Sequence, residues 1–525
     1  MTFPNRVWER GVELRFRAEL GNEAWNYVPK QSLGTRDETR GTWCLGYFAM
    51  SDAFNLRWKL DRPYLEQNTP GDVYALLTIE PNTAVRGSAP AATIPTHLIL
   101  LVDVSESMDV LVRRDPSAQK VGAGSAEGKV AQRVVSDVPS RREMACDVVQ
   151  KMVERLAGDD LLTLIAFDDH PHVLAKAVSP NNMDVVWSAI KKLSTVGGGG
   201  TAMGHAFECV RAVLSEKGSG VLNSSASQDA PRTHKLVLLT DGEDQNPDAT
   251  LATAKSVGWD FRLPIVAFGT GECKVAFLTE LAKTSLSGGF NHIRDEAAAQ
   301  MLFGQAVKNQ KNIQATNVQL QLWLSPELQV RELYRNKPEI LFVGDLQPDL
   351  NHQVALRLEQ MERGKAYEFL FRCSLPGRPA NQRFRIAKAM LTYDIPSMKK
   401  TQEKLEANII VEYTADVARA AERSGDVRKV LARAEVQRQV LFLQGKIDLL
   451  KAGGGSQRDR EIVAKLLEAL IKKFEDFGDQ ATANQYRTMK DEFTQKGTIS
   501  QEMLNRSLAA SSRAEEIVMA QDIDF

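Results

Sequence analysis

The sequence predicts an α/β protein with a doubly wound, mostly parallel sheet that is inserted in or followed by a β-sandwich, with an α-helical domain at the C-terminal end. Three patterns predict it: buried apolar runs alternating with helical spacing, then short period-two segments, then helical spacing alone. The length of 525 residues allows about three domains. The expected units are the N-terminal segment, the parallel sheet, the sandwich and the helical domain, at residues 1–95, 96–308, 309–414 and 415–525.

The composition is that of an ordinary globular protein. It is 43% hydrophobic and 25% charged with a net charge of −1, so no basic field draws the chain to nucleic acid or an anionic membrane. No apolar run approaches the roughly 20 residues that cross a bilayer, and residues 1–10 lack the apolar core of a signal peptide. Five scattered cysteines without a C-x-x-C pair suit a reducing compartment. We therefore expect a cytoplasmic protein with free thiols and with neither nucleic-acid nor membrane partners.

The N-terminal segment reads as strand only near its end. Residues 73–80 form a clear strand that stops at a Pro-Asn turn signal, and residues 83–95 read as a linker. Four of the seven tryptophans lie in residues 1–70, at Trp8, Trp25, Trp43 and Trp58. That much aromatic area is costly to leave in water, so we expect the segment to pack on another unit, and the 73–80 strand to join the sandwich.

The central unit opens with an apolar run that ends in Asp103-x-Ser105-x-Ser107. A run this uniformly apolar is typical of a strand buried on both faces, so the polar triplet falls at its carboxyl end, where open α/β sheets place their ligands. One carboxylate and two hydroxyls on a tight loop suit a hard divalent cation, because such cations prefer oxygen ligands.

Two further oxygen donors stand where such a site needs them. Thr201 follows the four glycines 197–200 and precedes a helical pattern, and Asp241 ends a second buried run, residues 235–240. Together with Asp103, Ser105 and Ser107, these residues strongly resemble the von Willebrand factor A (VWA) domain and its metal-ion-dependent adhesion site, over roughly residues 96–305. The chain looks like a bacterial intracellular multidomain member of that family.

The resemblance implies a role for each of the five residues. Ser105 and Ser107 would ligate the metal directly, Thr201 directly or through water, and Asp103 and Asp241 would hold metal-bound waters and the serine hydroxyls. With few carboxylates on the metal, one coordination position stays open for an acidic side chain of a partner. Mg²⁺ fits this donor set best, with Mn²⁺ as the usual substitute.

Several features near the motif leave alternatives open. Glu106 stands where many relatives carry glycine. If its carboxylate points to the metal, the affinity for an acidic side chain of a partner falls; if it points to solvent, that affinity is unchanged. The glycine run 197–200 either lets the threonine loop shift or simply makes a tight turn. The polar insertions at residues 109–140 and 218–231 read as loops, the first of them a lid, a partner-binding element or a tolerated insertion.

The rest of the chain changes character twice. Period-two segments predict short sandwich strands at residues 318–324, 339–343, 353–358, 368–373 and 384–393. From about Asp416 the spacing is helical, broken by glycines at 453–455, which predicts antiparallel helices joined by short loops. The tail at residues 522–525 reads as frayed chain or, less commonly, a docking peptide.

We expect a non-enzymatic adaptor with no catalytic residue and no cofactor besides the metal, whose VWA domain captures a Glu or Asp side chain of a protein partner. Bacterial intracellular relatives often serve MoxR-type AAA+ ATPases, so the resemblance implies that partner class. Two alternatives remain: a structural subunit that assembles through its helical C-terminus, or a metal-dependent hydrolase that uses Ser105, His205 or an unrecognised site outside the VWA region. The hydrolase lacks a Gly-x-Ser-x-Gly frame around Ser105.

Overall fold

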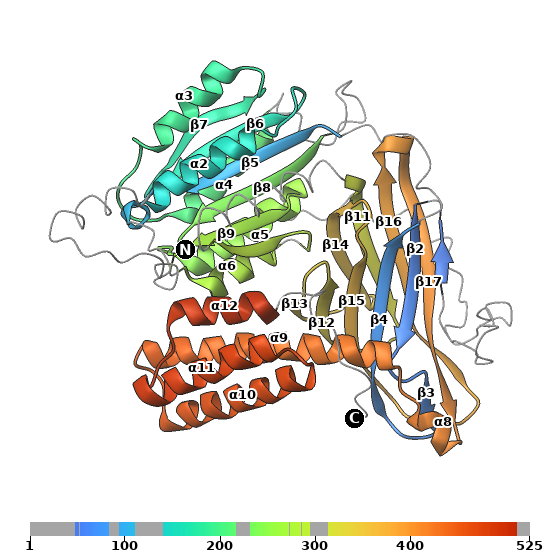
Figure 1. Cartoon of the computed structure of the whole chain (residues 1–525). Helices are drawn as coiled ribbons and strands as arrows, with labels where there is room; N and C mark the ends of the chain where they lie inside the picture. Colours follow the sequence, from blue (N-terminus) through green and yellow to red (C-terminus); the bar gives the residue numbers. More distant parts are fainter. Residues whose placement is uncertain are drawn as a thin grey trace, which may run out of the picture.

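A computed structural model describes residues 48–51, 53–82, 94–110, 140–216, 232–271, 273–284, 286–293 and 313–511. They form a parallel-sheet domain, a sandwich of two further sheets and a C-terminal set of helices, which lies below the sheet domain in Figure 1. The predicted fold class is therefore confirmed. Three of the N-terminal tryptophans, the tail, most of both predicted loops and the helix expected to end near residue 308 lie outside the described residues.

The parallel-sheet domain has six strands in the order β10-β9-β8-β5-β6-β7. All neighbours are parallel except β7, which pairs antiparallel with β6 at one edge. The strands are β5 (Thr96–Asp103), β6 (Leu161–Phe167), β7 (Pro171–Val178), β8 (Thr233–Thr240), β9 (Ile265–Thr270) and β10 (Gly289–Ile293).

Both faces of this sheet are covered, which explains why β5 is buried along its whole length. Leu98 and Leu100 of β5 join the core layer of α2 and α3, whereas Ile99 and Leu101 join the layer of α4, α5 and α6. The helices are α2 (Arg141–Val153), α3 (Met183–Leu193), α4 (Met203–Ser215), α5 (Pro247–Phe261) and α6 (Val275–Ala282), with a short 3₁₀ turn η2 (Glu106–Asp109) after β5. This two-sided burial is the reason that β5 reads as one uninterrupted apolar run.

The sandwich takes strands from both sides of the sheet domain in sequence. Strand β4 (Gly71–Pro81), which precedes it, pairs with β15 (Tyr367–Leu375), which follows it. One sheet has the order β1-β2-β4-β15-β12-β13 and the other β14-β11-β16-β17-β3. The remaining strands are β1 (Phe48–Met50), β2 (Phe54–Leu60), β3 (Tyr64–Glu66), β11 (Ile313–Leu324), β12 (Gln329–Lys337), β13 (Leu341–Asp345), β14 (Gln353–Glu362), β16 (Arg383–Ile395) and β17 (Lys400–Thr414), with a 3₁₀ turn η5 (Pro396–Met398). Trp58, the one described N-terminal tryptophan, is 2% exposed in this core.

The C-terminal helices connect the other two units. They are α8 (Val417–Ala421), α9 (Gly425–Lys451), α10 (Gln457–Asp476), α11 (Gln480–Lys496) and α12 (Gln501–Ser511). Their core is continuous with that of α4, α5 and α6. Midway along α9, Arg438 forms a 2.6 Å ion pair with Glu332 of β12, and Gln437 accepts a hydrogen bond from the backbone N–H of Phe342. Helix α9 therefore packs against both the parallel-sheet domain and the sandwich (Figure 1).

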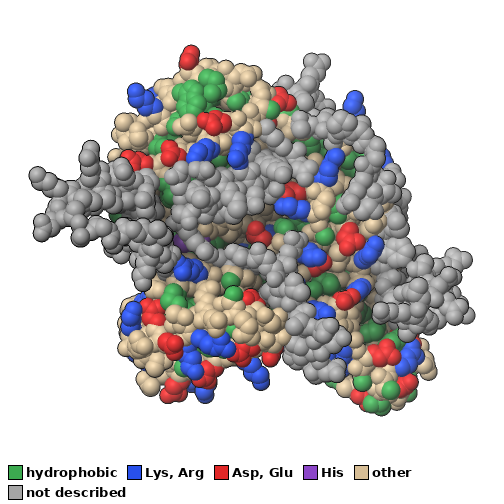
Figure 2. Space-filling view, viewed as in Figure 1, with side chains coloured by type: hydrophobic (Ala, Val, Ile, Leu, Met, Phe, Trp, Pro, Cys, Tyr) green, Lys and Arg blue, Asp and Glu red, His purple; other side chains and the backbone are tan. Residues whose placement is uncertain are grey.

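The surface shown in Figure 2 carries Lys and Arg interspersed with Asp and Glu over the C-terminal helices, so this face shows no large patch of one charge sign. No helix among the described residues is both long and apolar enough to cross a membrane.

A buried histidine pair lies at the start of the parallel strands. His97 of β5 is fully buried, its Nε2 lies 2.8 Å from the Thr163 hydroxyl, and its ring centroid lies 5.4 Å from that of His234. Burial, with smaller contributions from His234 and Arg232, lowers the pKa of His97 to about 3. The folded protein therefore holds this ring neutral.

We expect the free energy of unfolding to fall in acid because of this pair. The unfolded chain binds a proton at His97 near pH 6.5, but the folded chain does so only near pH 3, so the stabilisation is complete above about pH 6.5 and is lost as the pH drops toward 3. The loss from His97 amounts to about 2 kcal/mol at pH 5. Urea unfolding at several pH values from 7 to 5 gives the free energy of unfolding, which should fall less steeply with decreasing pH in His97→Gln than in the wild type. The same fall in both proteins contradicts the assignment.

Candidate metal centre

Asp103 is the most constrained residue at the carboxyl edge of the parallel sheet. It ends β5, is fully buried, and accepts hydrogen bonds at Oδ1 from the Ser105 backbone N–H (3.0 Å) and hydroxyl (2.6 Å). Its Oδ2 accepts from the Thr240 hydroxyl at the end of β8 (2.6 Å). Burial raises the pKa of Asp103 to about 6 even though these hydrogen bonds lower it; nearby Asp241 raises it slightly further. The carboxylate thus joins the ends of β5 and β8.

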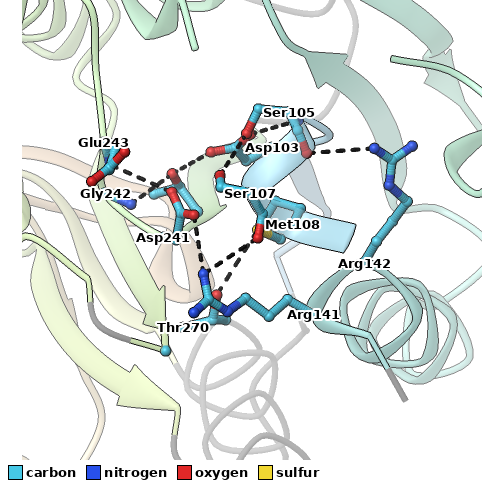
Figure 3. Close-up of polar contacts among 12 residues, drawn as sticks. Asp103, Ser105, Ser107, Met108, Arg141, Arg142, Asp241, Gly242, Glu243 and Thr270 are labelled. Atoms are coloured by element: carbon cyan, nitrogen blue, oxygen red, sulfur yellow. Dashed lines mark hydrogen bonds and ion pairs between the residues drawn. The ribbon is translucent and has the colours of Figure 1, made fainter. Parts of the chain in front are cut away.

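The two serines of the motif lie together beside this carboxylate. The hydroxyl oxygens of Ser105 and Ser107 are 3.0 Å apart, and the first donates to Asp103 (Figure 3). The spacing of two residues brings both hydroxyls to one side because η2 begins at once and turns the chain. Three of the five predicted residues are therefore in direct contact.

Asp241 lies close to this cluster and forms an ion pair with Arg141. The Arg141 guanidinium, at the first position of α2, donates from Nη1 to Asp241 Oδ2 (3.2 Å) and to the Ser107 carbonyl (3.4 Å). The pair is largely shielded from water, with side-chain exposures of 17% and 5%. A cation at a helix N-terminus opposes the helix dipole, so Asp241 supplies the compensating charge. Figure 3 shows Arg141 reaching toward Asp241, whereas Arg142 reaches the motif loop, where its Nη2 donates to the carbonyls of Val104 (2.7 Å) and Ser105 (3.5 Å).

Thr201 is buried, but no hydrogen bond joins its side chain to the other four residues in the described part of the chain. Its loop is nevertheless fastened to theirs. The Gly199 carbonyl accepts from the Glu106 backbone N–H (3.2 Å), and the Thr201 carbonyl from the Gln245 backbone N–H (3.0 Å). Gly197, Gly198 and Gly199 all have positive φ. A Cβ on Gly197 would lie 2.4 Å from Val104 Cγ2, so the turn requires glycine there.

The Glu106 side chain is exposed, in contrast to the buried Asp103 and Ser105. Among the described residues no hydrogen bond fixes its carboxylate toward the cluster. Glu243 is also exposed and lies within 3.8 Å of the Lys274 ammonium. Both acids therefore stand at the rim of the site.

The donor set is suited to a hard cation. The described residues contain no group of three His, Cys, Asp or Glu side chains positioned for a metal, so any ion here must draw on hydroxyls as well as carboxylates. The cluster supplies two serine hydroxyls and two buried carboxylates, all oxygen. The guanidinium on Asp241 also shows that the cluster attracts positive charge.

Comparison with known proteins identifies the unit that carries this cluster. Residues 98–243 match the family model of the von Willebrand factor type A domain. The chain contains a VWA domain. Among solved structures, the von Willebrand factor type A protein of Catenulispora acidiphila covers 89% of this chain and is itself covered to 99%, with a TM-score of 0.65 at 15% identity, which shows a shared fold.

Two further similar proteins were found. The ArnB paralog VWA2 of Sulfolobus acidocaldarius covers 88% of this chain and is covered to 98%, at 13% identity and a TM-score of 0.49. The uncharacterized protein sll0103 of Synechocystis is 24% identical over 333 residues, which make up 61% of this chain and 71% of that protein.

The structure adds residues of the VWA site that the sequence did not reveal. They are Arg141, Thr240 and Asp169. Asp169 accepts from the Gly200 backbone N–H (3.1 Å), which is the main cause of its lowered pKa. Asp244, whose acidity next to Asp241 is visible in the sequence, accepts from the Met203 backbone N–H (2.9 Å). Position in the sequence offers one signal for the missed residues: Thr240 directly precedes Asp241 at a strand end. Arg141 and Asp169 act through loop packing, which no local pattern predicts.

We expect the Thr240 hydroxyl to stabilise the VWA fold. Thr240→Val leaves Asp103 Oδ2 without its donor and the Gly242 backbone N–H without its acceptor, so the free energy of unfolding should fall by about 2 kcal/mol. Thr270→Val is the matched control, because Thr270 is also fully buried at a strand end but its hydroxyl contacts only the Met108 sulfur, at 3.9 Å. Urea unfolding in EDTA should show a larger loss of unfolding free energy for Thr240→Val than for Thr270→Val. Equal losses in the two variants contradict this expectation.

Proposed function

We propose that this protein is a non-enzymatic adaptor whose VWA domain captures a Glu or Asp side chain of a protein partner through a bound Mg²⁺, or Mn²⁺ in its place. Ser105, Ser107 and Thr201 would ligate the cation, and Asp103 and Asp241 would hold its waters. The observation that carries the proposal is the contact between Asp103, Ser105 and Ser107, three oxygen donors from one loop, beside a second buried carboxylate. An ion held mainly by neutral hydroxyls keeps its charge and therefore attracts an external carboxylate.

The exposed Glu106 side chain also supports capture of an acidic ligand. A carboxylate directed at the ion would reduce its positive charge and compete with the partner for the open position. Because Glu106 is exposed and η2 begins at that residue, the side chain lies outside the buried donor set.

A hydrolase is a poorer fit to the same contacts. The Ser105 hydroxyl is engaged by Asp103 and Ser107, and His205 is exposed with its Nδ1 3.5 Å from the Asp169 carbonyl. In the described residues, no histidine contacts the Ser105 hydroxyl, so a base to activate it is missing from the observed contacts.

One observation favours assembly through the C-terminal helices as a second candidate function. Phe442 and Leu449 of α9 are 51% and 41% exposed although both are large apolar residues. They lie seven residues apart, two helical turns, and so share one face of the helix. A structural subunit would bury that face against a neighbour, and α9 already connects the sandwich to the VWA domain.

The partner class and the compartment belong to the proposal as well. A MoxR-type AAA+ ATPase is the partner class implied by the resemblance to bacterial intracellular relatives. A cytoplasmic location fits Cys146, Cys209, Cys273 and Cys373, which are free thiols in the structure.

We expect loss of the Asp103 charge to abolish metal-dependent capture. Asp103→Asn keeps the shape and the acceptor oxygen, and Asp103→Ala removes both; Asp248→Asn removes an exposed carboxylate in the first turn of α5 and serves as the control. Titration calorimetry with Mg²⁺ and Mn²⁺, and co-purification followed by mass spectrometry with and without EDTA, should show binding for wild type and the control only. EDTA-sensitive capture that persists in both Asp103 variants would overturn the proposal.

We expect removal of Arg141 to strengthen metal binding. The guanidinium occupies Asp241 Oδ2, and a cation drawn to that carboxylate must displace it or share its field. Arg141→Gln should therefore bind Mn²⁺ about tenfold more tightly than wild type, which corresponds to about 1.4 kcal/mol. Lys274→Gln makes the same charge change at an exposed lysine near Glu243 and should leave the dissociation constant within about twofold, since exposed charges are screened. Unchanged affinity in Arg141→Gln would show that the two cations do not compete.

A further inference from the structure

A cavity far from the metal-binding motif in sequence lies where the VWA domain meets the sandwich. Its volume is about 360 Å³, and its walls come from the C-terminal end of α5 and from the outer face of strands β11, β14, β16 and β17. Cavities at the junction of two domains are common ligand sites. Nothing in the metal-site chemistry above uses this cavity.

The floor of the cavity is a row of polar side chains on four neighbouring strands. Arg357 of β14 is opposite Gln319 of β11, Gln319 is opposite Thr392 of β16, and Thr392 is opposite Lys404 of β17. All four line the cavity. Neighbouring strands lie about 4.8 Å apart, so the Cα atoms of the two cationic ends are about 14 Å from each other. The row therefore presents a positive charge at each end with neutral hydrogen-bonding groups between.

A third cation, Arg262, forms the wall at the end of α5. In the described residues none of Arg262, Arg357 and Lys404 forms an ion pair with a carboxylate: Arg262 donates to the Asn317 amide oxygen and Arg357 to the Trp259 carbonyl (3.2 Å). Arg357 also stacks on Trp259, with its guanidinium carbon 3.6 Å from the ring centroid. Burial lowers the pKa of Arg357 and the charge of Arg262 lowers it further, while the nearby Glu359 carboxylate acts in the opposite direction. Two like charges are thus held close together, an arrangement that a bound anion would relieve.

The carboxylate of Asp394, which also lines the cavity, is occupied elsewhere. Its Oδ2 accepts from the Asn317 side-chain amide, and its Oδ1 from the Gln402 backbone N–H (2.7 Å). It therefore organises the wall of the cavity. Glu359, the other carboxylate of the lining, attracts Arg357 and offsets part of the positive charge there, so the lining keeps three cations against two carboxylates.

Strained backbone is concentrated at the same place. Of the nine non-glycine residues with positive φ in the part of the chain that the structure describes, four line this cavity, namely Arg262 (49°), Asn317 (53°), Glu359 (56°) and Gln402 (55°). Asn317 and Glu359 accompany register shifts in the β11–β14 pairing. Such conformations are disfavoured for residues that carry a Cβ, and they cluster at ligand sites. This clustering is independent of the charge argument and points to the same location.

We propose that this cavity binds a carboxylate-bearing ligand, an extended acidic segment of a protein partner whose acidic side chains alternate along one face. Alternate residues of an extended chain are about 6.8 Å apart, so acids at positions i, i+2 and i+4 span the distance between Arg357 and Lys404. The side chains of Gln319 and Thr392 lie between these cations and would hydrogen-bond the segment. The site is separate from the metal site and does not depend on a metal.

The test uses the full-length protein in EDTA, which removes any contribution from the metal site. A fluorescent peptide Asp-Ser-Asp-Ser-Asp is titrated by anisotropy, with Asn-Ser-Asn-Ser-Asn as the neutral control and glutarate as a free dicarboxylate competitor. We expect saturable binding of the acidic peptide alone. Arg357→Gln should weaken it about tenfold, and Lys404→Gln, at an exposed position that leaves the fold unaffected, about threefold or more.

The matched control is Lys388→Gln. Lys388 lies on β16 outside the cavity and is paired with Glu406 at 2.9 Å, so its loss should leave the peptide affinity within about twofold. Competition by unlabelled peptide at a lower concentration than by glutarate supports a protein segment as the ligand. The reverse order would assign the cavity to a free small acid and overturn the proposed segment. Absence of binding at millimolar peptide, or equal weakening by all three substitutions, overturns it. Loss of the metal-dependent capture proposed above, with this binding retained, would leave the inference intact.

Discussion

The carboxylate of Asp103 is the constraint on which the VWA site depends. A fully buried carboxylate is costly unless it is hydrogen-bonded, and here donors from the loop after β5 and from the end of β8 satisfy both oxygens. The requirement fixes the conformation of the motif loop, because the Ser105 backbone N–H and hydroxyl must both face Asp103. The hydroxyl of Ser105 is then held 3.0 Å from that of Ser107. Satisfying one buried charge thus assembles the oxygen cluster.

A second buried carboxylate adds negative charge to the same region, and two buried negative charges are unfavourable unless a positive charge lies nearby. Asp241 is 4% exposed and adds to the cost of ionising Asp103. Arg141 offsets part of that cost, although its position at a helix N-terminus is one that the helix dipole disfavours. The chain therefore places an internal cation, Arg141, where the proposed function places a divalent ion, and under that proposal the two cations would compete for Asp241.

The sequence predicted the parts of the fold and site that lie on uniformly buried strands. The runs before Asp103 and Asp241 are apolar on both faces, and parallel strands bring their carboxyl ends to one edge, so the two acids were placed from pattern alone. Arg141 was not, since its side chain reaches the site only through tertiary packing. Strands β12 and β17 were also missed. In β12, Glu332, Arg335 and Asn336 are buried polar residues that disrupt alternation, and β17 begins with a charged stretch that resembles an exposed helix.

Helix α5 gives the two proposed sites a common element. It begins at Pro247, just after the loop of Asp241 and Asp244, and it ends at Phe261, beside the cavity wall formed by Arg262. Fifteen helical residues span about 22 Å. Ala254, Val257 and Phe261 of α5 pack in the core that the C-terminal helices share. Near its C-terminal end, Trp259 contacts Arg357 of the cavity. Coupling between the two sites would require that α5 have two arrangements that are close in free energy. That is the physical condition for communication over such a distance.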